Sequence, residues 1–232
     1  MSLIAVTEVS KVYDHSAVPV QALDRISLGV EAGEFTAIVG PSGSGKTTLL
    51  NMVGGLDRPT SGMIVIDGID ISSLRKDALI DFRLRHIGFV FQAYNLIPVL
   101  TAAENIEFIM LLQGVDKAER SRRTEELLEA VGLADRADTK PGQLSGGQQQ
   151  RVAVARALAS RPSFVLADEP TANLDTASAM ALLELMEDLN REHHMTFIFS
   201  THDFRVIQRA HRVVTLEDGR VKSDQLQSQA RA

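Results

Sequence analysis

The stretch GPSGSGKT, from Gly40 to Thr47, decides the fold. It matches the pattern GxxxxGK[ST] and lies between an apolar run, Phe35–Val39, and the helix-forming residues GKTTLLNMV, 45–53. A strand, a glycine-rich loop and a helix in this order are typical of a phosphate-binding loop. The glycines let the backbone N–H groups of residues 43–48 converge on a phosphate chain, and the helix adds the positive end of its dipole. The sequence therefore predicts a phosphate site in a parallel α/β sheet.

Each residue of this loop has an expected part in binding a nucleotide. We expect Lys46 to reach the β- and γ-phosphates, and the hydroxyl of Thr47 to bind Mg²⁺. A glycine-rich turn without a ligand is the simplest alternative, but it does not account for the strand and the helix on either side. The predicted nucleotide-binding segment consists of Gly40, Pro41, Ser42, Gly43, Ser44, Gly45, Lys46, Thr47 and Thr48.

A second motif places two carboxylates at the end of an apolar strand, FVLADE, Phe164 to Glu169. In a doubly wound sheet this strand end lies beside the phosphate loop. Asp168 would hold Mg²⁺, directly or through water, and Glu169 would orient or deprotonate an attacking water. Taken alone, a solvated acidic turn is an equally good interpretation, but the phosphate loop in the same chain favours the catalytic one.

A third motif, LSGGQ, runs from Leu144 to Gln148. Ser145 fits a helix N-cap, Gln148 closes a capping box, and the two glycines expose backbone N–H groups at the helix start. The motif thus predicts a second anion-binding helix terminus. On spacing alone, an ordinary capped helix remains an open alternative.

Together these motifs resemble, in type and order, those of ATP-binding cassette (ABC) nucleotide-binding subunits. The resemblance extends from Val9 to about Val221 and includes Gln92 after an apolar strand, the NLD segment 173–175, and His202 after another strand. It implies a P-loop ABC ATPase core and a homodimer in the ATP-bound state. In that dimer, paired head to tail, ATP would lie between the phosphate loop of one subunit and the LSGGQ segment of the other.

The resemblance also implies roles for individual residues. Gln92 would sense Mg²⁺ and the attacking water, His202 would hold the γ-phosphate and the water, and Asp175 would form a contact between subunits. The implied catalytic residues are Lys46, Gln92, Glu169 and His202. The implied metal ligands are Thr47, Gln92 and Asp168. Beyond the phosphate loop, the implied ATP-binding residues are Tyr13, which would stack on adenine, Ser145, Gly147, Gln148 and Asp175.

Longer strings narrow the resemblance to one branch of the family. GGLDRPTSG (54–62), IGFVFQAYNLIPVLTAAENI (87–106) and LADEPTANLD (166–175) resemble the lipoprotein-release and macrolide-exporter branch, which also contains cell-division ATPases. This implies an ATP-binding and ATP-hydrolysing subunit that powers a membrane permease, with residues 92–104 facing it. The subunit would lie on the cytoplasmic face of the membrane, held there by the permease. The alternatives are force transmission of the cell-division type, a non-transport ABC ATPase, and a scaffold with vestigial hydrolysis.

Periodicity indicates how the α/β fold is organised. Alternating residues at Ile4–Val12 and Ile26–Val30 predict an antiparallel β-layer. Residues 93–143 hold helical patterns without a strand, so we expect a helical subdomain there, inserted into a core of residues 1–92 and 144–222. Residues 223–232 are polar and predict a frayed tail.

Composition excludes several classes of protein. The net charge is −6 and only 5% of residues are aromatic, which disfavours a nucleic-acid partner. The chain has no cysteine, which excludes disulfides and thiolate metal sites. No apolar run approaches the ~20 residues of a membrane-spanning helix, so we expect no direct insertion into a membrane.

Four further residues depart from the motifs or lie outside them. Ala172 stands where glycine is common in the family, which would strain the backbone only if φ is positive there. Arg151 and Arg156 follow LSGGQ and are interpreted as surface charges, and Tyr94 as a surface or packing residue.

Overall fold

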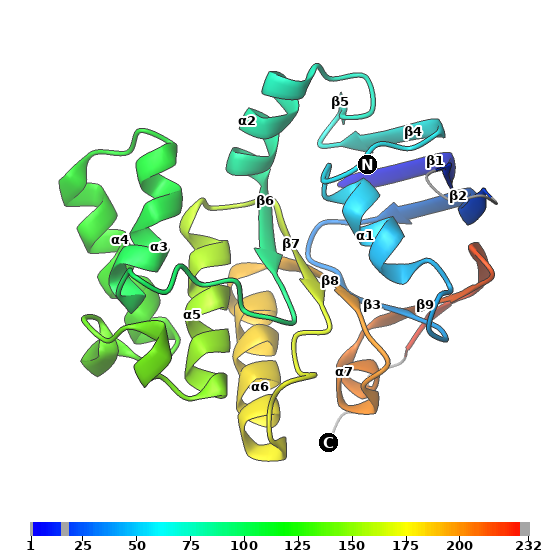
Figure 1. Cartoon of the computed structure of the whole chain (residues 1–232). Coiled ribbons are helices and arrows are strands. Elements are labelled where there is room, and N and C mark those ends of the chain that lie inside the picture. Colours follow the sequence, from blue (N-terminus) through cyan, green and yellow to red (C-terminus); the bar gives the residue numbers. More distant parts are fainter. Residues whose placement is uncertain (1, 15–18, 228–232) are drawn as a thin grey trace.

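The computed structural model describes residues 2–14 and 19–227, and its strands form two sheets (Figure 1). The six-stranded sheet has the order β10-β9-β3-β8-β7-β6, and the four-stranded sheet the order β2-β1-β4-β5. The first consists of β3 (Phe35–Val39), β6 (Ile87–Val90), β7 (Phe164–Asp168), β8 (Thr196–Ser200), β9 (Arg212–Glu217) and β10 (Arg220–Leu226). The second consists of β1 (Ile4–Tyr13), β2 (Val20–Val30), β4 (Ser61–Ile66) and β5 (Ile69–Asp70).

The large sheet is parallel from β6 to β9, which confirms the expectation from the apolar runs. β3 pairs in parallel with β8 and β9, and β7 pairs in parallel with β8 and β6. The central strands β3, β7 and β8 are almost wholly buried, as strands covered on both faces are. Their carboxyl ends consequently meet at one edge of the sheet.

The tail prediction is wrong for residues 223–226. These residues belong to β10, which pairs antiparallel with β9 at the edge of the large sheet. A polar edge strand of this kind is stabilised by backbone pairing and by an ion pair from Arg212 to Asp224, at 2.6 Å. Residues 228–232 lie outside the described part of the chain.

The small sheet is antiparallel, as the alternating pattern predicts. Ile4, Val6 and Val9 of β1 are buried, together with Ile26 and Val30 of β2. They share an apolar cluster with residues of α1 and with Ile38, Leu166 and Ile198 of the large sheet. A second cluster joins Phe35, Phe197 and Phe199 to the helices on the other side. Together the two clusters pack both faces of β7 and β8 just before the carboxyl ends of these strands.

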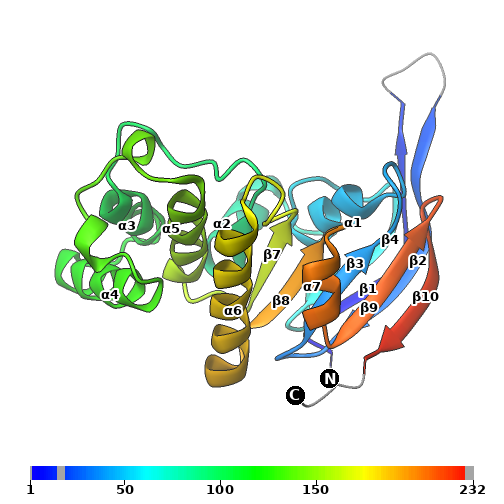
Figure 2. The same cartoon turned by 90° about the horizontal axis from the view of Figure 1, so that it is seen from below.

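Three helices, α3, α4 and α6, pack against α5, while α1, α2 and α7 lie beside strands of the sheets (Figures 1 and 2). They are α1 (Lys46–Val53), α2 (Lys76–His86), α3 (Ala102–Leu112), α4 (Lys117–Ala130), α5 (Gly146–Ala159), α6 (Thr176–His193) and α7 (Phe204–Arg209), with 3-10 turns at Ala134–Arg136 and Pro141–Gln143. In Figure 2, α3 and α4 lie beyond α5, away from both sheets. Residues 93–143 contain these two helices and the 3-10 turns but no strand. The subdomain boundaries at 93 and 143 remain a prediction.

Candidate functional site

The phosphate loop connects β3 to α1, and two of its glycines have no room for a side chain. Gly45, the N-cap of α1, has φ 102°. A Cβ on Gly45 would lie 2.6 Å from the carbonyl oxygen of Ala22, and a Cβ on Gly40 would lie 2.2 Å from that of Leu216. The small sheet and β9 thus press against the loop from outside. This close packing holds the loop in its curled form.

Polar atoms inside the loop suit a phosphate chain. Lys46 Nζ donates to the carbonyl oxygens of Gly40 at 2.9 Å and Pro41 at 3.0 Å, so the ammonium group lies over the loop. Ser44 Oγ is buried and has no hydrogen-bond partner in the described chain. A Cβ added to Gly43 would meet nothing within 4 Å. The loop thus combines an unpaired buried hydroxyl, open space at Gly43 and the ammonium group of Lys46, and this set of features fits an anionic ligand.

Thr47 and Asp168 meet between α1 and β7. Thr47 Oγ1 donates to Asp168 Oδ1 at 3.4 Å. Burial raises the pKa of the Asp168 carboxyl. A nearby cation would counteract this effect by favouring the ionised form.

The described residues include no cluster of three His, Cys, Asp or Glu that would hold a metal unaided. Mg²⁺ commonly binds one or two carboxylates together with substrate phosphates. The hydroxyl of Thr47 and the carboxylate of Asp168 fit that mode of binding.

Glu169 follows Asp168 and is held between two donors. Its Oε1 lies 2.7 Å from Nδ1 of His202, and its Oε2 accepts from Thr201 Oγ1 at 3.2 Å. The backbone N–H of Glu169 donates to the carbonyl oxygen of Ser200 at 2.8 Å, and its φ is 47°. The Glu169 side chain is 16% exposed and that of His202 is 76% exposed. The arrangement is a fixed carboxylate with an imidazole that reaches solvent.

Gln92 lies just beyond β6, on the same edge of the large sheet. The register of β6 with β7 pairs Val90 with Ala167, one residue before Asp168. The Gln92 side chain is exposed, and its backbone oxygen accepts from Asn173 Nδ2 at 2.9 Å.

Tyr13 lies at the end of β1, with its ring partly exposed. Its hydroxyl donates to Asp57 Oδ2 at 3.1 Å, and Lys11 Nζ lies 4.9 Å from the ring centroid. Asp57 also pairs with Lys11 at 2.8 Å. The phenol is therefore held in one place by two side chains.

The LSGGQ segment begins α5, and the predicted capping box is present. Gln148 N donates to Ser145 Oγ at 3.3 Å, and Ser145 N donates to Gln148 Oε1 at 2.9 Å. A Cβ on Gly147 would lie 2.8 Å from Ser178 Oγ, so the segment packs against the start of α6. Asp175 caps that helix, and hydrogen bonds from Ser178 lower the pKa of its carboxyl.

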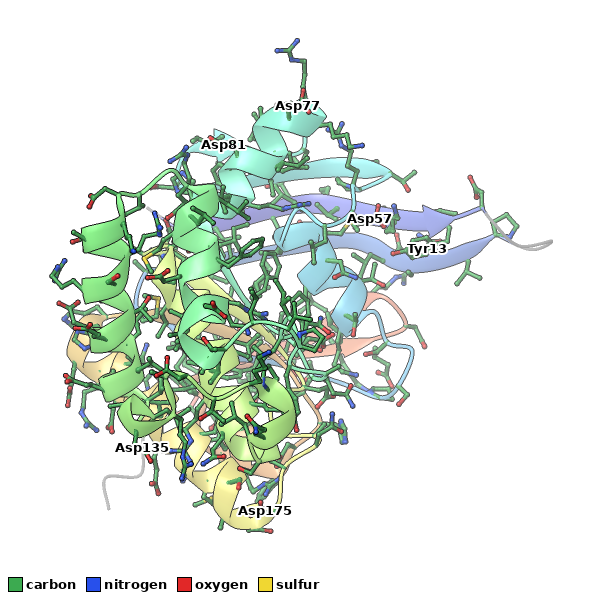
Figure 3. All side chains as sticks on the ribbon, turned by 60° about the vertical axis from the view of Figure 1, so that its left-hand side comes forward. Tyr13, Asp57, Asp77, Asp81, Asp135 and Asp175 are labelled. Carbon is green, nitrogen blue, oxygen red and sulfur yellow. The ribbon has the colours of Figure 1, made fainter. Side chains whose placement is uncertain are left out.

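These residues stand apart from the end of β1 that carries Tyr13. Figure 3 shows Tyr13 beside Asp57 on one side of the molecule, and Asp175 far from both. In the described chain, no hydrogen bond joins the LSGGQ segment to the phosphate loop. One chain thus carries the phosphate loop and the LSGGQ helix start as two separate elements.

The interpretation of Arg156 as a surface charge is wrong. Its side chain is partly buried and tied to the backbone: Nη2 donates to the carbonyl oxygen of Tyr94 at 2.8 Å, and Nη1 donates to that of Asn95. The apolar residues on both sides of Arg156, VAVA and ALA, are the sequence signal that indicates burial. Ala172 has no positive φ, so the substitution does not strain the turn.

A groove of about 560 Å³ lies between α2, β6 and α3. Two of the side chains that line it are cationic, Arg83 and Arg156, and none of the described lining residues is acidic. Its apolar lining includes Leu56, Ile80, Phe89, Phe108 and Leu112.

Every helix within residues 2–14 and 19–227 is too short or too polar to span a lipid bilayer.

Comparison with known proteins gives consistent matches. The family model described as ABC transporter matches residues 23–172. An uncharacterized ABC transporter ATP-binding protein of Thermotoga maritima is 50% identical over 220 residues, which cover 95% of this chain and 94% of that protein. The macrolide export ATP-binding/permease protein MacB of Rhodospirillum rubrum is 49% identical, with 96% of this chain but only 34% of that protein covered.

A solved structure matches over nearly the whole chain. It is the dimeric, post-hydrolysis state of the ATP-binding cassette MJ0796 bound to ADP and Pi. The TM-score is 0.88 at 42% identity, with 96% of this chain and 98% of that chain covered.

Proposed function

The chain belongs to the ABC transporter family of ATP-binding cassettes, and we propose that it works as a head-to-tail homodimer that drives a membrane permease of the lipoprotein-release or macrolide-export type. It is an ABC ATPase with the α/β fold of that family. The observation that carries the proposed ATP hydrolysis is the grouping of four side chains at one edge of the large sheet: Thr47, Asp168, Glu169 and His202.

We assign the phosphate loop to the triphosphate of ATP. Backbone N–H groups at the start of α1 and the ammonium of Lys46 bind the β- and γ-phosphates. The Ser44 hydroxyl offers a further donor inside the loop. Thr47, Asp168 and Gln92 would hold Mg²⁺, which neutralises charge on the phosphates when bound.

Glu169 is the proposed base for hydrolysis. It orients a water molecule toward the γ-phosphorus and accepts its proton as the new P–O bond forms. The bond between the γ-phosphorus and the β–γ bridging oxygen breaks, and ADP and inorganic phosphate leave. His202 holds the γ-phosphate and the water, and Thr201 steadies the second carboxylate oxygen of Glu169.

The dimer is proposed because each chain carries two separate phosphate-binding elements. Ser145, Gly147 and Gln148 would close on ATP bound to the phosphate loop of the partner subunit, and Asp175 would contact the partner across the interface. The dimeric form of the related cassette MJ0796 supports this arrangement.

The groove between α2, β6 and α3 is the proposed docking place for the permease. Its apolar lining suits a short helix of a partner, and it adjoins residues 92–104. The related MacB protein, by its name, combines ATP-binding and permease functions in one chain, and the present chain covers 34% of it. Such a partner would hold the subunit at the cytoplasmic face of the membrane.

Light scattering on Glu169→Gln tests the dimer. We expect the mass to rise from 25.3 kDa to about twice that value with Mg·ATP, and to stay unchanged with Mg·ADP. Glu169→Gln combined with Ser145→Arg is the matched control, because a bulky cation at the LSGGQ helix terminus would block closure. Demonstrated ATP binding without a mass change in the single variant would contradict ATP-driven pairing of the isolated subunit.

A further inference from the structure

The backbone around Gln92 is held by side chains from α5 and from the segment after β7. Gln150 Nε2 donates to the carbonyl oxygen of Phe91 at 3.4 Å, and Asn173 Nδ2 donates to that of Gln92 at 2.9 Å. Farther along the same segment, the Arg156 guanidinium donates to the carbonyl oxygens of Tyr94 and Asn95. Four carbonyl groups of a five-residue segment thus depend on side chains that are distant in sequence.

The turn that Arg156 holds has an unfavourable backbone conformation. Tyr94 has φ 58° and Asn95 has φ 51°. Asparagine adopts this left-handed region fairly readily, but a tyrosine there is strained and stays only where its surroundings impose the conformation. A planar guanidinium can bridge two adjacent carbonyl groups at once, which a lysine ammonium cannot do with the same geometry.

Arg156 has no carboxylate partner among the described residues. Burial lowers the pKa of its guanidinium, and its hydrogen bonds go to backbone oxygens. A partly buried cation without a carboxylate partner loses hydration that only these backbone oxygens replace. A residue that only filled space here would be better apolar, so the two carbonyl contacts need a reason beyond packing.

We infer that Arg156 is a positioning residue for ATP hydrolysis: by fixing the turn at Tyr94 and Asn95, it holds the segment that carries Gln92 at the sheet edge where Asp168 and Glu169 lie. This inference rests on the role of Gln92 in the proposed function. Arg156 stands roughly 15 Å along α5 from the LSGGQ end. If α5 shifts relative to the sheet, we expect the turn that Arg156 holds to move with it. The groove proposed for the permease is lined by the same guanidinium.

Amide hydrogen exchange on the nucleotide-free protein tests the structural step. The amides of Tyr94 and Asn95 donate to Phe91 and Ala93 within the turn. In Arg156→Ala these amides should exchange about tenfold faster. Arg151→Ala is the matched control, because Arg151 lies on the same helix and also donates to a backbone oxygen, but to that of Val131, at 3.3 Å, and not to residues 91–95. Unchanged exchange in Arg156→Ala would overturn the inference.

Steady-state ATP hydrolysis tests the catalytic step. We expect Arg156→Ala to lower kcat by about tenfold to a hundredfold and to leave KM for ATP within about twofold. Arg156→Lys should fall between the wild type and Arg156→Ala in both exchange and kcat. Full rescue by lysine would show that charge alone is needed and would overturn the bridging role.

A double-mutant cycle with Gln92→Ala separates positioning from general stabilisation. If Arg156 acts through Gln92, Arg156→Ala should change kcat by less than about twofold in the Gln92→Ala background. Additive losses would overturn the inference. If Gln92→Ala alone keeps the kcat of the wild type, Gln92 has no role in hydrolysis and that part of the proposed function is wrong. Any loss of kcat in Arg156→Ala would then have another cause, and the inference would fall as well.

Discussion

Glu169 and His202 face each other across the ends of two neighbouring parallel strands, with Oε1 of the carboxylate 2.7 Å from Nδ1 of the imidazole. The register of β7 with β8 pairs Asp168 with Ser200, so each functional residue follows its strand by one or two positions. The strand pairing therefore sets the distance between the two side chains. Buried phenylalanines on these strands keep that pairing rigid.

Replacement of the Glu169 carboxylate by an amide should separate ATP binding from hydrolysis. We expect Glu169→Gln to bind Mg·ATP with an affinity close to that of the wild type and to lose about 10²–10⁴-fold in turnover, the usual contribution of a general base. Equilibrium binding and phosphate release measure the two quantities. Asp188→Asn, a change at an exposed carboxylate that pairs with Arg191, is the matched control. Turnover near that of the wild type would assign the base to another residue.

Asp203, next to His202, should make stability depend on acidic pH. Burial favours the neutral acid, but hydrogen bonds from Arg205 and Thr171 outweigh it and lower the pKa of Asp203 from 3.8 to about 2. The charged form stabilises the fold, so its contribution is complete above about pH 4 and is lost as the pH falls toward 2. Allowing for solvent screening, we expect the charged carboxylate of Asp203 to add about 1 kcal/mol to the free energy of unfolding at neutral pH.

Chemical denaturation of Asp203→Asn measures this effect. The variant should be less stable than the wild type at pH 7, and the difference should shrink by pH 2.5 if both proteins remain folded enough to measure. A destabilisation that is equal at both pH values would show that the carboxylate charge is not responsible.

The sequence allows the parallel strands, the phosphate loop and the capping box at Ser145 to be predicted, because each depends on a local pattern. It does not reveal α2, whose N-cap Arg75 makes no side-chain cap and whose buried apolar residues are only Leu79 and Phe82. It also does not reveal β10, since a polar edge strand has no apolar alternation.

The hydrogen bonds that Arg156 makes to the turn at Tyr94 and Asn95 cannot be predicted from the local sequence either, although the apolar residues around Arg156 indicate burial. Its partners Tyr94 and Asn95 are 62 and 61 positions away, and only the fold brings them together. The catalytic roles inferred from the motifs remain predictions, although the structure places their side chains at one edge of the sheet.

A charge introduced into the groove should disrupt permease docking without affecting the nucleotide site. Ile80 is 45% exposed and lines the groove, so Ile80→Asp costs little stability. We expect this variant to keep its affinity for ATP but to lose co-sedimentation with membranes from the source cells. Leu226→Asp, at an 82% exposed position on β10, should sediment as the wild type does. Retention of Ile80→Asp on the membranes would exclude the groove as the docking place.

Tyr13 should contribute to binding of the base and not of the phosphates. Stacking of a base on an aromatic ring is worth about 1–3 kcal/mol, so Tyr13→Ala should weaken ATP binding about tenfold or more and leave the affinity for inorganic triphosphate nearly unchanged. Tyr13→Phe is the matched control, because it keeps the ring and removes only the hydrogen bond to Asp57. It should bind ATP almost as the wild type does. Equal losses for ATP and triphosphate in Tyr13→Ala would mean that the ring only supports the end of β1, through its contacts with Lys11 and Asp57.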